Sequence, residues 1–507
     1  MHHVQVREPG SEHELRHLAV RDLLRADSDE AAPYAALKRE AARVDRGQGR
    51  LSERARSARA GMGSRAWLTS VSQSMRRLVL TLSLLVALTA PTAAASYRPM
   101  KGVAAPGPAK YDRVWLQKLG SRGAHNVLVL VPGFFGGAGG ITPVARDIVR
   151  RVPDLAVWIV DRREQAFEDT SMFEQGDPRA AEDYYLGFRY RRVLDKDVPF
   201  VGRWGLKVHL GDLRRVVTAA RAGGRRRVIL GGHSLGASTT VAYAAWDFGG
   251  RAGYRDIDGM VLIDGGLRGS FDSAGLARAE RILAQIRAGE VFDDLIGFGV
   301  PEIAGVFAQV GALWAATEPD APSSLYQNPL IPPEFKAPVL TTNEATLAYA
   351  FDKDTSPASL GLMHIRAGRL SDSGEPRPWE DGELTPIGRF ARTYAANRPN
   401  ALQWYFPRRL RLDVDAMSPL RETAATRKLR LRPFHAKEID VPLYAYGADL
   451  TRGRVERGAR LLARQSRLER PVIVSDRNAS HLDPLSAAPD SNRFLETVVP
   501  FLRQVVR

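Results

Sequence analysis

The segment Gly232-His233-Ser234-Leu235-Gly236 constrains the fold of this chain more than any other stretch of its sequence. It follows an apolar run at residues 227–230 and leads into small residues that include Ala237 and Ala242. A serine on a sharp turn from strand to helix exposes its hydroxyl, and glycines two residues before and after it avoid collisions with neighbouring backbone. The pattern predicts a nucleophile elbow formed by Gly232, His233 and Gly236 around Ser234. The alternative is an ordinary serine-containing turn.

Elsewhere in the chain, apolar strand-like runs alternate with stretches of helical spacing, as a turn from strand to helix requires. Apolar runs occur at residues 126–131, 155–160, 227–230, 259–263, 441–446 and 472–474. Helical spacing is found at residues 205–221, and the last segment, 492–505, is predicted to be a closing helix. Strands that alternate with helices predict the α/β class, with a mostly parallel sheet flanked by helices.

Composition excludes several chemistries. The 507 residues include no cysteine, which removes thiol nucleophiles, disulfides and cysteine-bound zinc. The formal net charge is +16, with basic clusters at residues 189–192, 225–227 and 408–411. Because these clusters are separated by stretches with the pattern of folded structure, they favour solvated surface charge over nucleic-acid binding.

The N-terminal part differs from the rest. Residues 1–74 are polar, without a sustained apolar period. Met75-Arg76-Arg77, an apolar stretch at 78–90 and small residues at 93–95 are typical of a secretory signal peptide. The apolar stretch is shorter than the roughly 20 residues of a spanning helix. We therefore expect a secreted, extracellular protein that starts at Met75, with 1–74 as a misassigned extension and 75–95 as signal peptide. The alternative is a true extension, with residues 78–90 as a membrane anchor.

A serine nucleophile needs a general base, and histidine is scarce enough to search by elimination. The ten histidines are His2, His3, His13, His17, His125, His209, His233, His364, His435 and His481. The first four precede the signal peptide, and His233 would point away from the hydroxyl of Ser234. His481 lies in a loop between the last short apolar run and the closing helix, where a base can be delivered above the strand ends. We predict His481 as the base; the alternative is a surface loop histidine.

A third residue must orient the imidazole and stabilise its charged form. Asp449 directly follows the apolar run at 441–446, and we favour it as the acid. Asp264 ends the run at 259–263 and is the main alternative. Asp483, two residues after the predicted base, is a weaker local candidate.

Hydrolysis through a serine also needs two backbone N–H donors where negative charge develops. One is expected at Leu235, which follows the nucleophile. The other is expected at Phe134, in the glycine-rich loop Pro132-Gly133-Phe134-Phe135-Gly136-Gly137-Ala138-Gly139-Gly140. This loop has neither the G-x-x-x-x-G-K-[ST] nor the G-x-G-x-x-G pattern, so nucleotide binding is not predicted.

A long insertion at residues 265–440 separates Asp264 from the next strand and predicts a cap. Within it, residues 296–316 are nearly uncharged, which fits a core helix of the cap or, alternatively, the wall of a site for an apolar substrate. An earlier aromatic segment could form the opposite wall or simply pack; it contains Phe167, Phe173, Tyr184, Tyr185, Phe188 and Tyr190.

The Pro132-Gly133-Phe134 loop, the elbow, Asp449 and His481 together resemble the α/β-hydrolase superfamily in order and spacing, and exported bacterial serine esterases and lipases most of all. The resemblance covers residues 111–264 and 441–507, which implies a core in two parts, 96–264 and 441–507, around a helical cap. The oxyanion loop departs from the His-Gly pair or Gly-Gly-Gly run that many of these esterases have.

The resemblance implies a carboxylic ester hydrolase of the EC 3.1.1 type, acting through an acyl-enzyme on a small-molecule or lipid ester with an apolar acyl or alcohol part. No metal or organic cofactor and no nucleic acid are implied, and loose association with a membrane or cell surface is compatible with it. Alternatives are a peptidase, amidase or acyltransferase with the same residues, or a non-catalytic surface protein.

Overall fold

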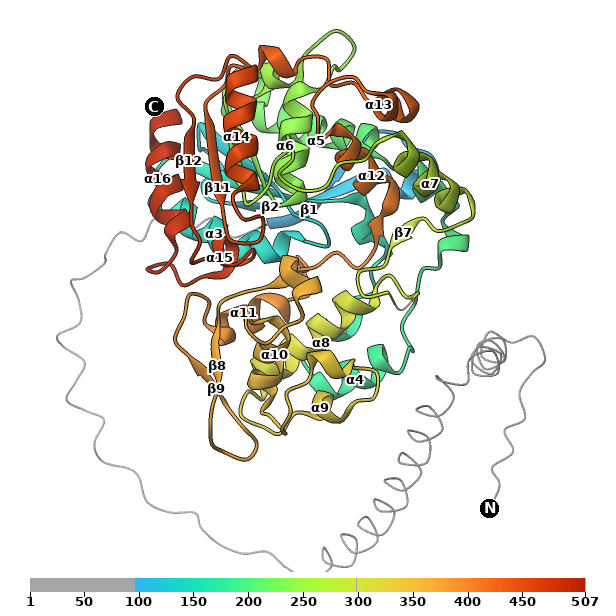
Figure 1. Cartoon of the computed structure of the whole chain (residues 1–507), viewed down its shortest axis with the longest axis vertical. Coiled ribbons are helices and arrows are strands. Elements are labelled where there is room, and N and C mark those ends of the chain that lie inside the picture. The colour runs from blue at the N-terminus through green and yellow to red at the C-terminus, as the bar shows by residue number, and fades with distance from the viewer. Residues whose placement is uncertain (1–95, 298, 507) are drawn as a thin grey trace, which may run out of the picture. The chain divides into compact units, whose positions relative to one another are not determined.

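The strands of the core form one eight-stranded sheet within residues 96–297 and 299–506, the part of the chain that the computed structural model describes (Figure 1). Along the sheet the strands are β1 (Ser96–Lys101), β2 (Arg113–Leu119), β4 (Leu155–Asp161), β3 (Asn126–Val131), β5 (Arg227–His233), β6 (Gly259–Ile263), β11 (Leu443–Gly447) and β12 (Val472–Ser475). β2 is antiparallel to both of its neighbours, and every pair from β4 to β12 is parallel. The predicted mostly parallel sheet is confirmed.

The central strands are almost continuously apolar because helices cover both faces of the sheet. In β3, Val127, Val129 and Val131 pack into one apolar cluster, and Leu128 and Leu130 pack into the other. One face is covered by α3 (Ala138–Arg151) and α16 (Arg493–Val505), and the other by α5 (Leu206–Arg221), α6 (Leu235–Ala245) and α14 (Arg454–Gln465). A short helix, α15 (Asp483–Ser486), follows the last strand.

Only part of the predicted cap at residues 265–440 lies over the ends of the parallel strands (Figure 1). That part comprises α8 (Ile303–Thr317), α9 (Ser324–Gln327), α10 (Asn343–Phe351), α11 (Ile387–Tyr394) and the hairpin of β8 (Gly368–Leu370) and β9 (Trp379–Asp381). It also includes α4 (Pro178–Leu186), from the connection between β4 and β5, which packs against α8.

The remainder of the insertion packs beside the core. It comprises α7 (Leu276–Arg287), α12 (Arg408–Met417), α13 (Ala424–Leu429) and the short pair β7 (Phe292–Asp293) and β10 (Phe406–Pro407). The apolar side chains of α12, including Leu410 and Val414, join the cluster beneath α5 and α6. The helical pattern of this segment predicts a buried stripe but not the partner that buries it.

The aromatic segment at residues 167–190 packs rather than lining a site. Phe173 stacks on Tyr185 with ring centroids 4.3 Å apart, and both belong to a third apolar cluster with Trp314 and Trp404. This cluster is the core of the cap.

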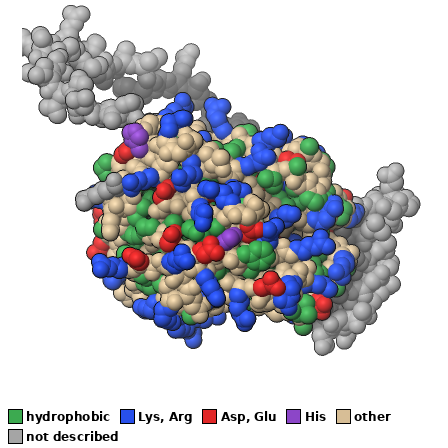
Figure 2. All heavy atoms as spheres, turned by 90° about the horizontal axis from the view of Figure 1, so that it is seen from above, with side chains coloured by type: hydrophobic (Ala, Val, Ile, Leu, Met, Phe, Trp, Pro, Cys, Tyr) green, Lys and Arg blue, Asp and Glu red, His purple; other side chains and the backbone are tan. Residues whose placement is uncertain are grey.

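The predictions for residues 1–74 and 75–95 lie outside the described residues. In the described part, no helix is long and apolar enough to cross a membrane. Figure 2 shows Lys and Arg side chains spread over the face seen from above, with Asp and Glu between them. The expectation that this charge does not serve nucleic-acid binding stays a prediction.

Candidate active site

Ser234 lies on a strained turn between β5 and α6. Its φ of 55° and ψ of −120° are rarely adopted by residues other than glycine, and its amide donates to the carbonyl of Ile263 at 2.8 Å. A Cβ on Gly232 would lie 2.4 Å from the carbonyl carbon of Gly236, and one on Gly236 would lie 2.0 Å from the carbonyl oxygen of Val131. The structure therefore forms the predicted elbow, and both glycines are required by close approach of the backbone.

The imidazole of His481 is hydrogen-bonded to Asp264, not to Asp449. His481 Nδ1 lies 2.5 Å from Asp264 Oδ2, and both side chains are buried, with exposed fractions of 1% and 0%. The other carboxylate oxygen, Oδ1, accepts from the amide of Ala448 at 2.8 Å. The carboxylate is thus fixed on both sides, and Nδ1 carries the proton because its partner is an acceptor.

The prediction of Asp449 as the acid is wrong, and the alternative, Asp264, is the residue that meets the imidazole. Asp449 is exposed, and its backbone amide donates to Ala479 at 3.0 Å. The loop after β12 carries His481 back across the end of β11, so the acid comes from β6, next to the strand that carries the serine.

Asp483, the weaker candidate, organises the loop instead of the imidazole. Its carboxylate accepts from the amide of Ser480 at 2.7 Å, the hydroxyl of Thr385 at 2.7 Å and the amide of Arg366 at 3.0 Å. Burial raises the pKa of Asp483 to about 6. Thr385 and Arg366 belong to the cap, which therefore contributes to the placement of the histidine loop.

His233 has a structural role that its place in the sequence does not indicate. Its side chain is turned away from solvent, and Nε2 donates to the backbone carbonyl of His481 at 2.9 Å. Burial, reinforced by repulsion from His481, holds the pKa of His233 well below its usual value. His233 is therefore neutral, and it ties the elbow directly to the loop that carries the predicted base.

The glycine-rich loop before α3 is shaped by a segment that returns from the cap. The amide of Gly137 donates to Ala401 at 2.8 Å, and that of Gly139 donates to Asn400 at 2.9 Å. A Cβ on Gly137 would lie 2.3 Å from the carbonyl of Asn400, and one on Gly139 would lie 2.3 Å from the carbonyl of Pro399. The glycines thus admit a neighbouring backbone, which accounts for a loop that resembles a phosphate-binding loop in composition.

Both predicted oxyanion donors lie at this site. Leu235 is the first residue of α6, where a backbone N–H has no acceptor within the helix. Phe134 lies in the loop between β3 and α3, and its ring packs edge-on against Phe406 with centroids 4.6 Å apart. Phe134, Ser234 and His481 line one cavity. Among the described residues, no group of three or more His, Asp or Glu side chains converges as metal ligands.

Four features now occur together: the strand order with β2 reversed, the strained serine turn after β5, an aspartate after β6 and a histidine after the last strand. The chain has the α/β-hydrolase fold.

Solved structures similar to this chain include a thermophilic esterase from Thermogutta terrifontis, an α/β-hydrolase fold protein from Nakamurella multipartita and a monoacylglycerol lipase from Paleococcus ferrophilus. Each is 13% identical to it. The matches cover 82%, 81% and 77% of this chain and 100%, 99% and 99% of theirs, with TM-scores of 0.38, 0.35 and 0.36. Because these scores are below 0.5, the fold assignment rests on strand order and site geometry.

The family model described as GrpB protein matches residues 1–53, which precede the described part of the chain. No curated protein matches the chain.

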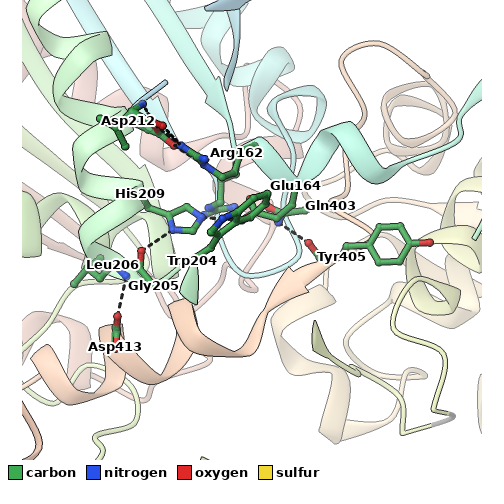
Figure 3. A network of polar contacts seen from close by, with 12 residues as sticks. Arg162, Glu164, Trp204, Gly205, Leu206, His209, Asp212, Gln403, Tyr405 and Asp413 are labelled. Carbon is green, nitrogen blue, oxygen red and sulfur yellow. Dashed lines mark hydrogen bonds and ion pairs between the residues drawn. The ribbon is translucent and has the colours of Figure 1, made fainter. Parts of the chain in front are cut away.

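Asp161, the last residue of β4, and Arg162, which follows it, hold the glycine-rich loop at residues 132–140. The guanidinium of Arg162 donates to the carbonyls of Pro132 and Gly136 and, at 2.8 Å, to the side-chain oxygen of Gln403. Figure 3 shows the buried polar network of which Arg162 and Gln403 are part. Burial lowers the pKa of Arg162 to about 10, which leaves it charged at neutral pH.

Asp161 holds the other end of the loop. Its carboxylate accepts from the amide of Ala138, the first residue of α3, at 2.6 Å and from the hydroxyl of Tyr97 at 2.8 Å. Burial raises the pKa of Asp161 to about 7, although the hydrogen bonds from Tyr97 and Ala138 oppose this shift. No sequence signal identifies Asp161 and Arg162 as site residues, because nothing in a strand-ending Asp-Arg pair indicates contact with a distant loop.

The raised pKa of Asp161 makes stability depend on pH with a definite sign. Between about pH 4 and pH 7 the folded state holds a proton that the unfolded state has lost, so the free energy of unfolding falls as pH rises through this window. Asp161→Asn keeps an acceptor for Ala138 and removes the titration. We expect the variant to gain stability relative to the original protein, by at most about 4 kcal/mol, between pH 4.5 and 8 in urea unfolding. Parallel pH profiles for the two proteins would contradict this.

Proposed function

We propose that the protein is a serine hydrolase that cleaves carboxylic esters, with Ser234 as nucleophile, His481 as general base and Asp264 as the acid that orients it. The observation that carries the proposal is the buried hydrogen bond of 2.5 Å between His481 Nδ1 and Asp264 Oδ2, beside a cavity shared by His481 and Ser234. A nucleophile on a strained turn, an oriented base and backbone donors in one cavity are the parts that acyl transfer requires.

The geometry assigns a role to each part. With Nδ1–H held by Asp264, Nε2 of His481 is free to accept the proton of the Ser234 hydroxyl as its oxygen attacks the ester carbonyl. The carbonyl oxygen becomes negative and is met by the amides of Leu235 and Phe134. His481 then gives the proton to the leaving alcohol. Water, activated by the same nitrogen, releases the acid from Ser234.

The walls of the cavity favour an ester with an apolar part. Around Ser234 and His481 the lining includes Phe134, Ile141 and Leu482. Apolar walls with a few convergent polar groups are typical of sites for small organic ligands. The similar solved structures whose descriptions name an esterase and a monoacylglycerol lipase agree with this reaction class.

Replacement of the nucleophile tests the reaction class. We expect Ser234→Ala to abolish turnover of p-nitrophenyl esters and covalent labelling by a fluorophosphonate probe, because Ser234 supplies the attacking oxygen. An alanine at position 234 would have to adopt the strained φ of 55°, which can lower stability. The thermal unfolding of the variant must therefore be measured beside its activity. A folded variant that still labels would exclude Ser234 as the nucleophile. A parallel panel of anilides and alcohol acceptors separates ester hydrolysis from amide cleavage and acyl transfer.

A matched pair of variants tests the assignment of the acid. Asp264→Asn should lower kcat by about 10³- to 10⁴-fold, because an amide favours the wrong tautomer of His481. Asp449→Asn, at the exposed position, should leave kcat within about twofold, since surface substitutions far from special features have small effects. Steady-state kinetics on one ester decide the matter, and the reverse ranking would restore Asp449 as the acid.

A second matched pair tests the support of the oxyanion loop. Arg162→Lys removes the fork that reaches Pro132 and Gln403 together, so we expect kcat to fall by about 10- to 100-fold with KM little changed. Arg163→Lys is the control, because this neighbouring buried arginine pairs with Asp212, at 2.8 Å, and its other hydrogen bonds within the described residues go to Asp112 and to the carbonyl of Val103, not to the loop. It should lower the Tm and leave kcat within about threefold. Equal losses of kcat in both variants would indicate a general structural effect.

A further inference from the structure

A second cavity, with a volume of about 100 Å³, adjoins the cavity of Ser234. The two share three wall residues, Phe135, Met363 and Leu402. The second cavity lies within the cap, between α8, α9 and α10, and its described lining is apolar except for two side chains. An apolar space beside a nucleophile is a place where the apolar part of a substrate can be bound.

Helix α8 has no charged side chain, and two of its faces make apolar contacts. Ala304, Phe307, Ala308 and Gly311 follow the i, i+3, i+4, i+7 spacing of one helix face and line the cavity. The opposite face, which includes Val306, Val310 and Leu313, packs into the core of the cap. The two alternatives for residues 296–316 therefore both hold. One side of the helix is a site wall, and the other side belongs to the core of the cap.

The two polar side chains in the described lining of this cavity, Thr346 and Gln403, are already engaged. The hydroxyl of Thr346 is hydrogen-bonded to the hydroxyl of Thr341 at 2.7 Å and to the carbonyl of Thr342 at 3.0 Å. Gln403 accepts from Arg162 at 2.8 Å and donates to the carbonyl of Tyr405 at 2.8 Å. A polar ligand group placed here would lose its hydrogen bonds to water without replacement, which selects against all but hydrocarbon.

The position of the cavity also indicates which half of the ester enters it. During hydrolysis the leaving alcohol must lie at His481, which protonates it, so the acyl chain must leave the carbonyl carbon in another direction. The lining of the second cavity includes Phe135, next to the predicted oxyanion donor, and Leu402. His481, Leu482 and Leu485 line only the cavity of Ser234. The acyl side of the ester is therefore the one that faces the cap cavity.

We propose that the substrate is an ester of an unbranched aliphatic acid, whose chain passes Phe135, Met363 and Leu402 and is bound between α8 and α10. This inference rests on the proposed ester hydrolysis for its catalytic consequence, but the binding of a hydrocarbon chain by the cap does not depend on it.

Gly311 offers a way to fill the cavity without disturbing the helix. A Cβ at this position would lie 3.5 Å from Leu325 Cδ1 and 3.6 Å from Leu347 Cδ1, which is ordinary contact. Because Gly311, Leu325 and Leu347 all line the cavity, we expect a leucine side chain at position 311 to take up part of it. Glycine is a poor helix former, so Gly311→Leu also improves helix propensity. Gly388→Leu is the matched control, because Gly388 lies on α11, another helix of the cap, and lines neither cavity.

The experiment measures kcat/KM for p-nitrophenyl esters from acetate to palmitate. Each buried methylene can contribute up to about a fourfold gain, so we expect octanoate to exceed acetate by at least about 10-fold in the original protein and in Gly388→Leu. Gly311→Leu should remove most of this gain, measured as the ratio of kcat/KM for octanoate to kcat/KM for acetate. A rate that does not rise with acyl length, or a gain that Gly311→Leu leaves intact, overturns the proposal. A preference for long alkyl acetates over short ones, with no preference for acyl length, overturns the assignment to the acyl side.

A binding measurement separates this proposal from the proposed reaction. Ser234→Ala protein is titrated with cis-parinaric acid, a fluorescent fatty acid, with and without the additional change Gly311→Leu. We expect saturable binding that Gly311→Leu weakens at least about 10-fold. If the original protein hydrolyses no ester, the reaction fails, while this binding still supports a chain site in the cap. Absence of binding, or equal binding by both proteins, overturns the chain site even where ester hydrolysis is observed.

Discussion

The hydrogen bond between His481 and Asp264 is the interaction on which the site depends, and it joins residues 217 positions apart. The pairing of β6 with β11 and of β11 with β12 brings the end of β6 and the loop after β12 together. A buried carboxylate is costly unless it is hydrogen-bonded, and Ala448 supplies the remaining bond. The elbow contributes as well, since His233 holds the backbone of His481. The strand order that completes the sheet therefore also brings Asp264 and His481 together.

The cap belongs to the site as much as the core does. Segment 399–402 lies against the glycines of the oxyanion loop, and the backbone amide of Gln403 donates to the carbonyl of Phe135 at 2.8 Å. Arg162 is hydrogen-bonded both to the loop and to the side chain of Gln403. Strain is concentrated here too, because Phe135, Ser234 and Asp264 all have positive φ. Residues in such conformations cost roughly 1–3 kcal/mol each and persist only where their surroundings fix them. The hydrogen bonds from cap and core provide that fixation.

What the sequence could predict was what local patterns determine. The elbow, the strand runs and the closing helix depend on neighbours in the chain, and the structure has them where they were expected. Asp264 and Asp449 each follow a strand, so no local signal separates them; the difference lies in which strand end the His481 loop reaches. The glycines at 137 and 139 are explained by a backbone more than 250 positions away. The packing of α12 on the core and the support given by Arg162 are likewise contacts between distant segments.

The pairing of Gly136 with Leu402 has a thermodynamic consequence. Phe135 and Leu402 line the apolar cavity of the cap, while their backbones flank the point where the oxyanion loop meets the returning segment. A ligand that fills the cavity therefore rests on the residues that fix the loop. Binding free energy gained in the cavity, away from the reacting carbonyl carbon, can then be used to order the loop beside that carbon. If an occupant of the cavity orders the loop, linkage requires that an ordered loop bind that occupant more tightly in turn.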